Sequence, residues 1–254
     1  MFVETRGDGP DLVLIHGWAM HAGIFAPLIS LLAPHFRLHL VDLPGHGFNR
    51  NDDGAVDLLE WATRIRAATP PGAIWVGWSL GGLVALQAAL DAPAAVRGLV
   101  EIAESPRLLT APDWPHGVAP AALAEFGAAL QRDYRRTIER FLALELIGSA
   151  HAPSLLRELK AHVFAHGEPD LRVLVEGLHL LETADLRDRL HELRMPSLWI
   201  AGRRDRLIPA AAMRWSAQHA AGDYLELDAG HAPFLSHPQA VADAISGFAA
   251  TLAS

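Results

Sequence analysis

The chain has 254 residues, of which 51% are hydrophobic and 20% are charged, with a formal net charge of −8 and no cysteine. This composition predicts a globular chain with a sizeable core, and its acidic balance argues against nucleic acid or an anionic membrane as the main partner. The lack of cysteine excludes disulfides, thiol nucleophiles and cysteine-ligated metals. The N-terminus has no signal-peptide pattern, and no stretch is apolar enough to span a membrane, so we expect a cytoplasmic protein, which we take to be a monomer.

Short apolar runs alternate with helical patterns through the first hundred residues. Strands are expected at 12–15, 38–41, 73–76 and 98–102. The expected helices cover 25–32, 58–68 and 83–90, the second of them capped by Asp57. Strands and helices in this alternation predict βαβ units, and therefore an α/β fold with a mostly parallel sheet flanked by helices.

The alternation stops between about 106 and 185, where no strand-like run occurs. Four amphipathic patterns predict helices there, at 121–132, 135–147, 154–164 and 171–182. Further elements are then expected at 197–201, 210–220, 224–227 and 238–252. We interpret 106–185 as a helical cap inserted into a core that is formed by 1–105 and 186–254.

The stretch Gly77-Trp78-Ser79-Leu80-Gly81 lies between a predicted buried strand and a predicted helix. In this context G-x-S-x-G forms a nucleophile elbow, a sharp turn that needs small residues on either side of a strained serine. The turn would expose Ser79 at the N-terminus of a helix, whose dipole favours developing negative charge.

A serine needs a histidine to accept its proton, and a carboxylate to orient that histidine. In this fold both partners follow later strands, in the order serine, acid, histidine. His231 follows the last predicted strand and is favoured over His237, which precedes Pro238 at a helix start. Asp205 follows the strand before it and is favoured over Asp228, which lies only three residues from His231.

An acyl-transfer site also needs an oxyanion hole, made by two N–H groups that point at the developing negative oxygen. The backbone N–H of Leu80 is one candidate. Trp18, in the loop after the first predicted parallel strand, is the other, and we expect His16 to brace that loop. No cofactor or metal is predicted, because the His35/His39 and His162/His166 pairs lack the rest of a metal motif and no nucleotide-binding fingerprint is present.

Arg132, Arg136 and Arg140 are four residues apart and therefore share one face of a predicted helix, while Arg157 adds charge on the next one. On composition alone this face is a solvated surface or a docking patch for an acidic partner. The apolar residues between the charges either face the core or form an acyl pocket; they are Phe141, Leu142, Leu144 and Ile147.

The chain resembles the α/β-hydrolase superfamily and, within it, the pimeloyl-[acyl-carrier-protein] methyl ester esterases of biotin biosynthesis. The likeness rests on 12–18, 39–47, 77–82, 140–144 and 230–238, together with Asp113-Trp114-Pro115. It implies a triad, an oxyanion hole, an acyl pocket and a surface for the acidic acyl carrier protein. The implied residues are Ser79, Asp205 and His231 for the triad, Trp18 and Leu80 for the hole, Phe141, Leu142, Ala143, Leu144 and Glu145 for the pocket, and Arg136, Arg140 and Arg157 for the carrier protein.

Three positions depart from the pattern that this resemblance implies. Glu145 stands where a glutamine is expected, Pro153 replaces a basic residue, and Asp205 is flanked by arginines. The sequence therefore predicts a serine carboxylesterase that frees the pimeloyl carboxylate through an acyl-enzyme. The alternatives are a carboxylesterase of broad specificity for small esters and a non-catalytic ligand-binding protein with a hydrolase fold.

Overall fold

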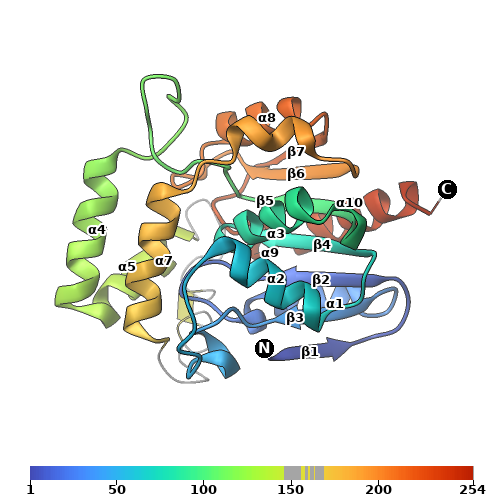
Figure 1. Ribbon diagram of the computed structural model, residues 1–254, viewed down its shortest axis with the longest axis horizontal. Helices are drawn as coiled ribbons and strands as arrows, with labels where there is room; N and C mark the ends of the chain where they lie inside the picture. The colour runs from blue at the N-terminus through green and yellow to red at the C-terminus, as the bar shows by residue number, and fades with distance from the viewer. Residues whose placement is uncertain (146–155, 158–159, 161–162, 164–168, 254) are drawn as a thin grey trace.

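The computed structural model describes residues 1–145, 156–157, 160, 163 and 169–253, without the side chains of 144 and 145. Its centre is a sheet of seven strands in the order β1-β3-β2-β4-β5-β6-β7 (Figure 1). Every neighbouring pair is parallel except β1 and β3, which are antiparallel. The strands are β1 Val3–Arg6, β2 Asp11–Ile15, β3 Arg37–Val41, β4 Ala73–Trp78, β5 Val96–Ile102, β6 Ser197–Gly202 and β7 Asp223–Leu227. The predicted α/β class is confirmed.

The helices that flank the sheet either connect these strands or follow the last of them. They are α1 Ala26–Leu32, α2 Leu58–Ala68, α3 Leu80–Asp91, α8 Ala210–His219, α9 Pro233–Ser236 and α10 Pro238–Thr251, with short 3-10 turns at Ala22–Phe25, Gly47–Asn49, Pro93–Ala95 and Arg187–Glu192. Helix α1 packs on α10, and α2 packs on α3. Asp57 caps α2 as predicted, because its side chain accepts a hydrogen bond from the N–H of Glu60.

Three further helices lie together beside the sheet, on the left in Figure 1. They are α4 Pro120–Arg132, α5 Tyr134–Glu145 and α7 Leu171–Thr183, and α4 packs against both of the others. Most of the helix predicted at 154–164 lies outside the described residues. The division of the chain into a core and an inserted cap remains our interpretation.

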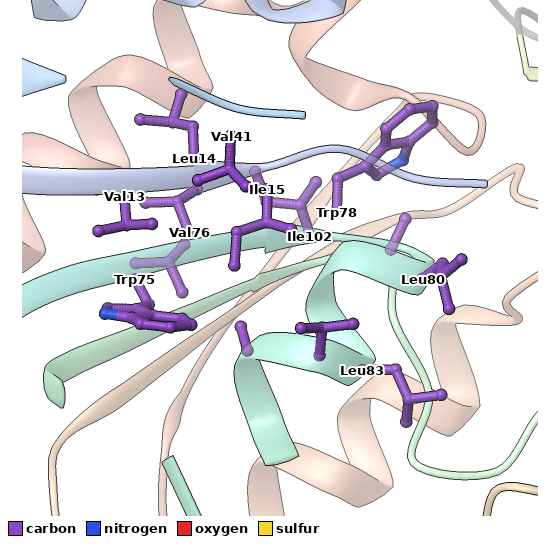
Figure 2. Close-up of a cluster of buried hydrophobic side chains, with 14 of the residues drawn as sticks. Val13, Leu14, Ile15, Val41, Trp75, Val76, Trp78, Leu80, Leu83 and Ile102 are labelled. Atoms are coloured by element: carbon purple, nitrogen blue, oxygen red, sulfur yellow. The ribbon is translucent and has the colours of Figure 1, made fainter. Parts of the chain in front are cut away.

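The central strands are buried on both faces, which explains why they read as continuous apolar runs. Val13, Leu14 and Ile15 of β2 pack beside Trp75 and Val76 of β4, and this apolar cluster extends to Leu80 and Leu83 at the start of α3 (Figure 2). Rigid strands therefore lead directly into the turn at Ser79. No helix among the described residues is long and apolar enough to cross a membrane.

Candidate active site

Ser79 occupies the sharp turn between β4 and α3, with φ of 53° and ψ of −122°. A non-glycine residue held at positive φ is strained, and such strain is typical of functional sites. The turn is also crowded. A side chain at Gly77 would collide with the Cα of Gly82, and one at Gly81 would collide with the carbonyl oxygen of Ile15. The glycines are therefore required by close backbone contacts, and the local geometry is that of a nucleophile elbow.

The structure brings Ser79, His231 and Asp205 together in one hydrogen-bonded chain. His231 Nε2 lies 3.0 Å from Ser79 Oγ, and its Nδ1 lies 2.7 Å from Asp205 Oδ2. The other oxygen of Asp205 accepts hydrogen bonds from the backbone N–H groups of Leu207 and Ile208, at 2.7 and 2.9 Å. In the tautomer that serves both partners, Nδ1–H donates to Asp205 and Nε2 accepts from the serine hydroxyl. This arrangement can activate a hydroxyl nucleophile.

Asp228 and His237, the alternatives for the acid and the base, make contacts with other residues. The carboxylate of Asp228 pairs with Arg204 at 2.5 Å and with Arg203 at 2.8 Å. His237 makes its side-chain contact with Ser236 Oγ at 2.8 Å. Two of the three arginines that flank Asp205 in the sequence, Arg203 and Arg204, are therefore paired with Asp228 and not with Asp205 in the described structure.

The candidate oxyanion donors are backbone N–H groups on two adjacent segments. Leu80 is the first residue of α3, where a helical N–H has no partner within its own helix. Neither the N–H of Leu80 nor that of Trp18 has an acceptor among the described residues. The two segments are in close contact, because a Cβ added at Gly17 would lie 3.2 Å from the Cβ of Ser79. Both N–H groups therefore lie on segments next to Ser79 and remain candidates for an oxyanion hole.

Two buried histidines hold the loop that carries Trp18. His16 Nε2 accepts a hydrogen bond of 2.9 Å from the N–H of Leu43, so it braces the loop as expected. His46 Nε2 accepts one of 3.3 Å from the N–H of Ala19. Burial lowers the pKa of His46 to about 4 and the pKa of His16 well below its ordinary value, which keeps both rings neutral and able to accept.

A cavity of about 300 Å³ opens at Ser79 and His231. Its wall is mainly apolar, and it is lined by Trp18, Leu83, Leu108, Val118, Ala122, Leu123, Phe126, Phe141, Leu178, Leu181, Leu207 and Ile208, with Glu104, Ser105 and Arg206 as the other polar residues. The edge of the Trp18 ring packs on Phe141, with ring centroids 5.3 Å apart. A cavity of this size and polarity suits a short acyl chain.

The predicted pocket residues on α5 do not all reach the cavity. Phe141 lines it, whereas Leu142 is fully buried in the hydrophobic core and Ala143 is exposed. Successive residues on a helix point about 100° apart, so five consecutive residues cannot share one wall. The side chains of Leu144 and Glu145 lie outside the described part of the chain, as do Ile147 and Pro153.

Part of the predicted basic face is present on α5, but Arg132 is the last residue of α4 and so does not share a helix with Arg136 and Arg140. Arg136 and Arg140 are exposed opposite the buried Thr137 and Ile138, and neither has an acidic partner among the described residues. Arg157 is also exposed. Lys160, another cation of this region, pairs with Glu139 at 2.9 Å. The face is thus a solvated surface with cations available to a partner.

A pair of buried carboxyl groups behind the elbow was missed from the sequence. Glu101 and Glu104 are at most 1% exposed, and none of their four carboxyl oxygens has a hydrogen-bond partner in the described structure. Burial raises the pKa of both groups well above the ordinary value, and the charge of Glu104 raises that of Glu101 further. The one signal was a glutamate inside the otherwise apolar run 98–102 of β5.

The described residues contain no cluster of three or more histidine and acidic side chains that could hold a metal ion. His39 instead contacts Asp11, with Nε2 2.7 Å from Oδ1, and His162 and His166 are not among the described residues.

Comparisons with known proteins agree with the mostly parallel sheet and its flanking helices. A family model described as "alpha/beta hydrolase fold" matches residues 10–238. The chain belongs to this family.

Two relatives are both named pimeloyl-[acyl-carrier protein] methyl ester esterase. One, from Xanthomonas oryzae pv. oryzae (strain MAFF 311018), is 52% identical over 99% of this chain and 100% of its own. The other, from Stenotrophomonas maltophilia (strain R551-3), is 53% identical over 99% of this chain and 97% of its own.

Solved structures agree on the fold. An esterase from Exiguobacterium antarcticum has a TM-score of 0.88 at 19% identity, covering 100% of this chain and 95% of its own. The enol-lactonase from Burkholderia xenovorans LB400 has a TM-score of 0.85 at 19% identity, covering 98% and 96%.

Proposed function

We propose that the protein is a serine carboxylesterase that hydrolyses the methyl ester of a pimeloyl group on acyl carrier protein, freeing the pimeloyl carboxylate for biotin biosynthesis. The observation that carries the chemistry is the chain from Asp205 through His231 to Ser79, which ends in an apolar cavity. The names and full-length identity of the relatives support the substrate.

In the first half-reaction Ser79 Oγ attacks the ester carbonyl carbon while His231 Nε2 takes the hydroxyl proton. The carbonyl oxygen becomes negative and is stabilised by the N–H groups of Leu80 and Trp18. When the tetrahedral intermediate collapses, the carbon–oxygen bond to the methoxy group breaks, and His231 gives its proton to the departing oxygen. Methanol leaves, and the acyl group stays on Ser79.

In the second half-reaction water attacks the same carbonyl carbon, and His231 accepts one of its protons. The second intermediate collapses by breaking the bond to Ser79 Oγ, which regains a proton from His231. Asp205 stays ionised and stabilises the imidazolium in both steps. The products are the free carboxylate and the original enzyme.

The cavity gives this reaction a place for the acyl chain, and the basic face of α5 gives it a place for an acidic carrier. In this proposal the chain lies against Phe126, Phe141 and Leu178. The exposed Arg136, Arg140 and Arg157 contact the carrier protein. The cap formed by 106–185, a monomeric state and a cytoplasmic location belong to the same proposal.

A comparison of rates tests the function against its alternatives. We expect faster hydrolysis of the carrier-bound methyl ester than of dimethyl pimelate, and loss of the difference in Arg136→Glu plus Arg140→Glu. Equal rates that salt and these substitutions leave unchanged would favour an esterase of broad specificity for small esters. No hydrolysis of any ester, with retained ligand binding, would indicate a non-catalytic binding protein.

A further inference from the structure

Arg206 is an exposed cation on the wall of the active-site cavity. It belongs to the loop between β6 and α8 and follows Asp205 directly. Within the described structure, its guanidinium has no acidic partner and no hydrogen bond. An exposed side chain that also lines the cavity must stand at its rim, so a ligand that enters the cavity passes this charge.

The neighbouring arginines are already neutralised. Arg203 and Arg204 both pair with Asp228, and neither lines the cavity. Of the loop's three arginines, only Arg206 is left with an unbalanced charge in the described structure.

The other polar groups of the cavity wall are occupied or hidden. Ser79 and His231 contact one another. Ser105 Oγ donates a hydrogen bond of 2.7 Å to the carbonyl oxygen of Arg107. Glu104 is buried, and its carboxyl oxygens do not reach the surface. Among the described lining residues, Arg206 is therefore the charged group that a ligand can contact.

We propose that Arg206 forms a subsite for an anionic group carried by the substrate beyond its acyl chain. Guanidinium groups bind the oxygens of phosphate and carboxylate with two parallel hydrogen bonds, which makes either group a suitable ligand. One source is the phosphate of the arm that tethers an acyl group to a carrier protein, and the other is a terminal carboxylate. The inference rests on the proposed ester hydrolysis but does not require carrier docking on α5.

Two matched pairs of methyl esters test this subsite. The first pair is the methyl pimeloyl thioester of phosphopantetheine and that of pantetheine, which differ by the phosphate. The second pair is monomethyl pimelate and dimethyl pimelate, which differ by the carboxylate. The measured quantity is the ratio of kcat/KM for the anionic member to that for the neutral member, at low and at high salt.

In wild-type protein this ratio should fall with salt, because screening weakens an exposed charge interaction. Arg206→Gln should lower the ratio about tenfold for at least one pair, Arg206→Lys should restore part of it, and Arg206→Glu should lower it further. Arg203→Gln is the matched control and should leave the ratio unchanged. The pair that responds identifies the anion as phosphate or carboxylate.

An unchanged ratio for both pairs in Arg206→Gln would overturn the subsite, as would an equal change in Arg203→Gln. Failure of the proposed function is a separate result, in which wild-type protein hydrolyses none of the four esters. In that case calorimetric binding of both ester pairs to wild type and to Arg206→Gln decides the inference. Equal affinities for the two members of each pair in wild type would then overturn it.

Discussion

Trp18 Nε1 donates a hydrogen bond of 2.9 Å to the carbonyl oxygen of Leu174, and so joins the loop after β2 to helix α7. The same ring packs edge-on against Phe126 and Phe141, with centroids 5.5 and 5.3 Å apart. One residue therefore supplies a candidate oxyanion N–H and also fixes the helices that line the cavity. The shape of the cavity and the position of this candidate N–H therefore depend on the same side chain.

Trp18→Phe removes this hydrogen bond but keeps an aromatic ring. We expect it to lower the free energy of unfolding by about 1 kcal/mol. Trp61→Phe is the matched control, because Trp61 Nε1 donates a similar bond of 3.1 Å to Ala55 far from the cavity. Urea unfolding should give similar losses for both variants, whereas kcat/KM for a pimeloyl ester should fall several-fold only in Trp18→Phe. Equal activities in the two variants would show that the link does not shape the site.

Substituting each of Asp205 and Asp228 by asparagine tests which of the two is the acid that orients His231. Asp205→Asn removes the carboxylate that holds His231 and should lower kcat by about ten-thousand-fold. Asp228→Asn only breaks exposed ion pairs with Arg203 and Arg204, so its kcat should stay within about threefold of wild type. Steady-state hydrolysis of a chromogenic ester measures both. A larger loss in Asp228→Asn would reassign the acid.

Gly82 lies where the two buried carboxyl groups meet the first turn of α3. A Cβ there would overlap a carboxyl oxygen of Glu101 and would lie 2.6 Å from Cγ of Glu104. Gly82→Ala should therefore destabilise the fold by about 1–3 kcal/mol. Gly247→Ala, in α10 with nothing within 4 Å of an added Cβ, should stabilise it by about 0.5–1 kcal/mol. Urea unfolding compares the two. A neutral Gly82→Ala would mean that the glutamates rearrange without cost.

The Glu101 and Glu104 pair predicts a loss of stability at higher pH. The pKa values of both glutamates are raised in the folded protein above the ordinary value of 4.5. As pH rises above 4.5, the unfolded chain therefore releases these protons at a lower pH than the folded protein does. The contribution of the two glutamates to the free energy of unfolding is complete below pH 4.5. It is lost as the pH rises through their pKa values in the folded protein. The Tm should fall as the pH rises above about 5, and the fall should be shallower in Glu101→Gln plus Glu104→Gln. The exposed Glu125→Gln should keep the wild-type slope. An identical slope in the double variant would refute this origin.

Much of the fold could be predicted because its signals are local. Buried parallel strands appear as apolar runs, the cap at Asp57 is a local hydrogen bond, and the turn at Ser79 carries its own glycines. Strand β1 was missed, because an antiparallel edge strand of four half-exposed residues has no apolar run to reveal it.

The side-chain pairings that complete the site were harder to predict. The bond from Trp18 to Leu174 joins residues 156 positions apart, and no spacing rule connects them. The burial of Glu104 and the exposure of Arg206 likewise depend on how the loops pack over the sheet. The order of Ser79, Asp205 and His231 along the chain could be predicted, because each follows a parallel strand and the strand ends share one edge of the sheet.

Intact-protein mass spectrometry after rapid mixing with a methyl pimeloyl ester tests whether Ser79 carries the acyl group during hydrolysis. We expect a mass increase equal to the acyl group, located on the peptide that contains Ser79, which forms and decays during turnover and is absent in Ser79→Ala. Hydrolysis by Ser79→Ala at the wild-type rate, or an acyl group found on another residue, would show that Ser79 is not the nucleophile.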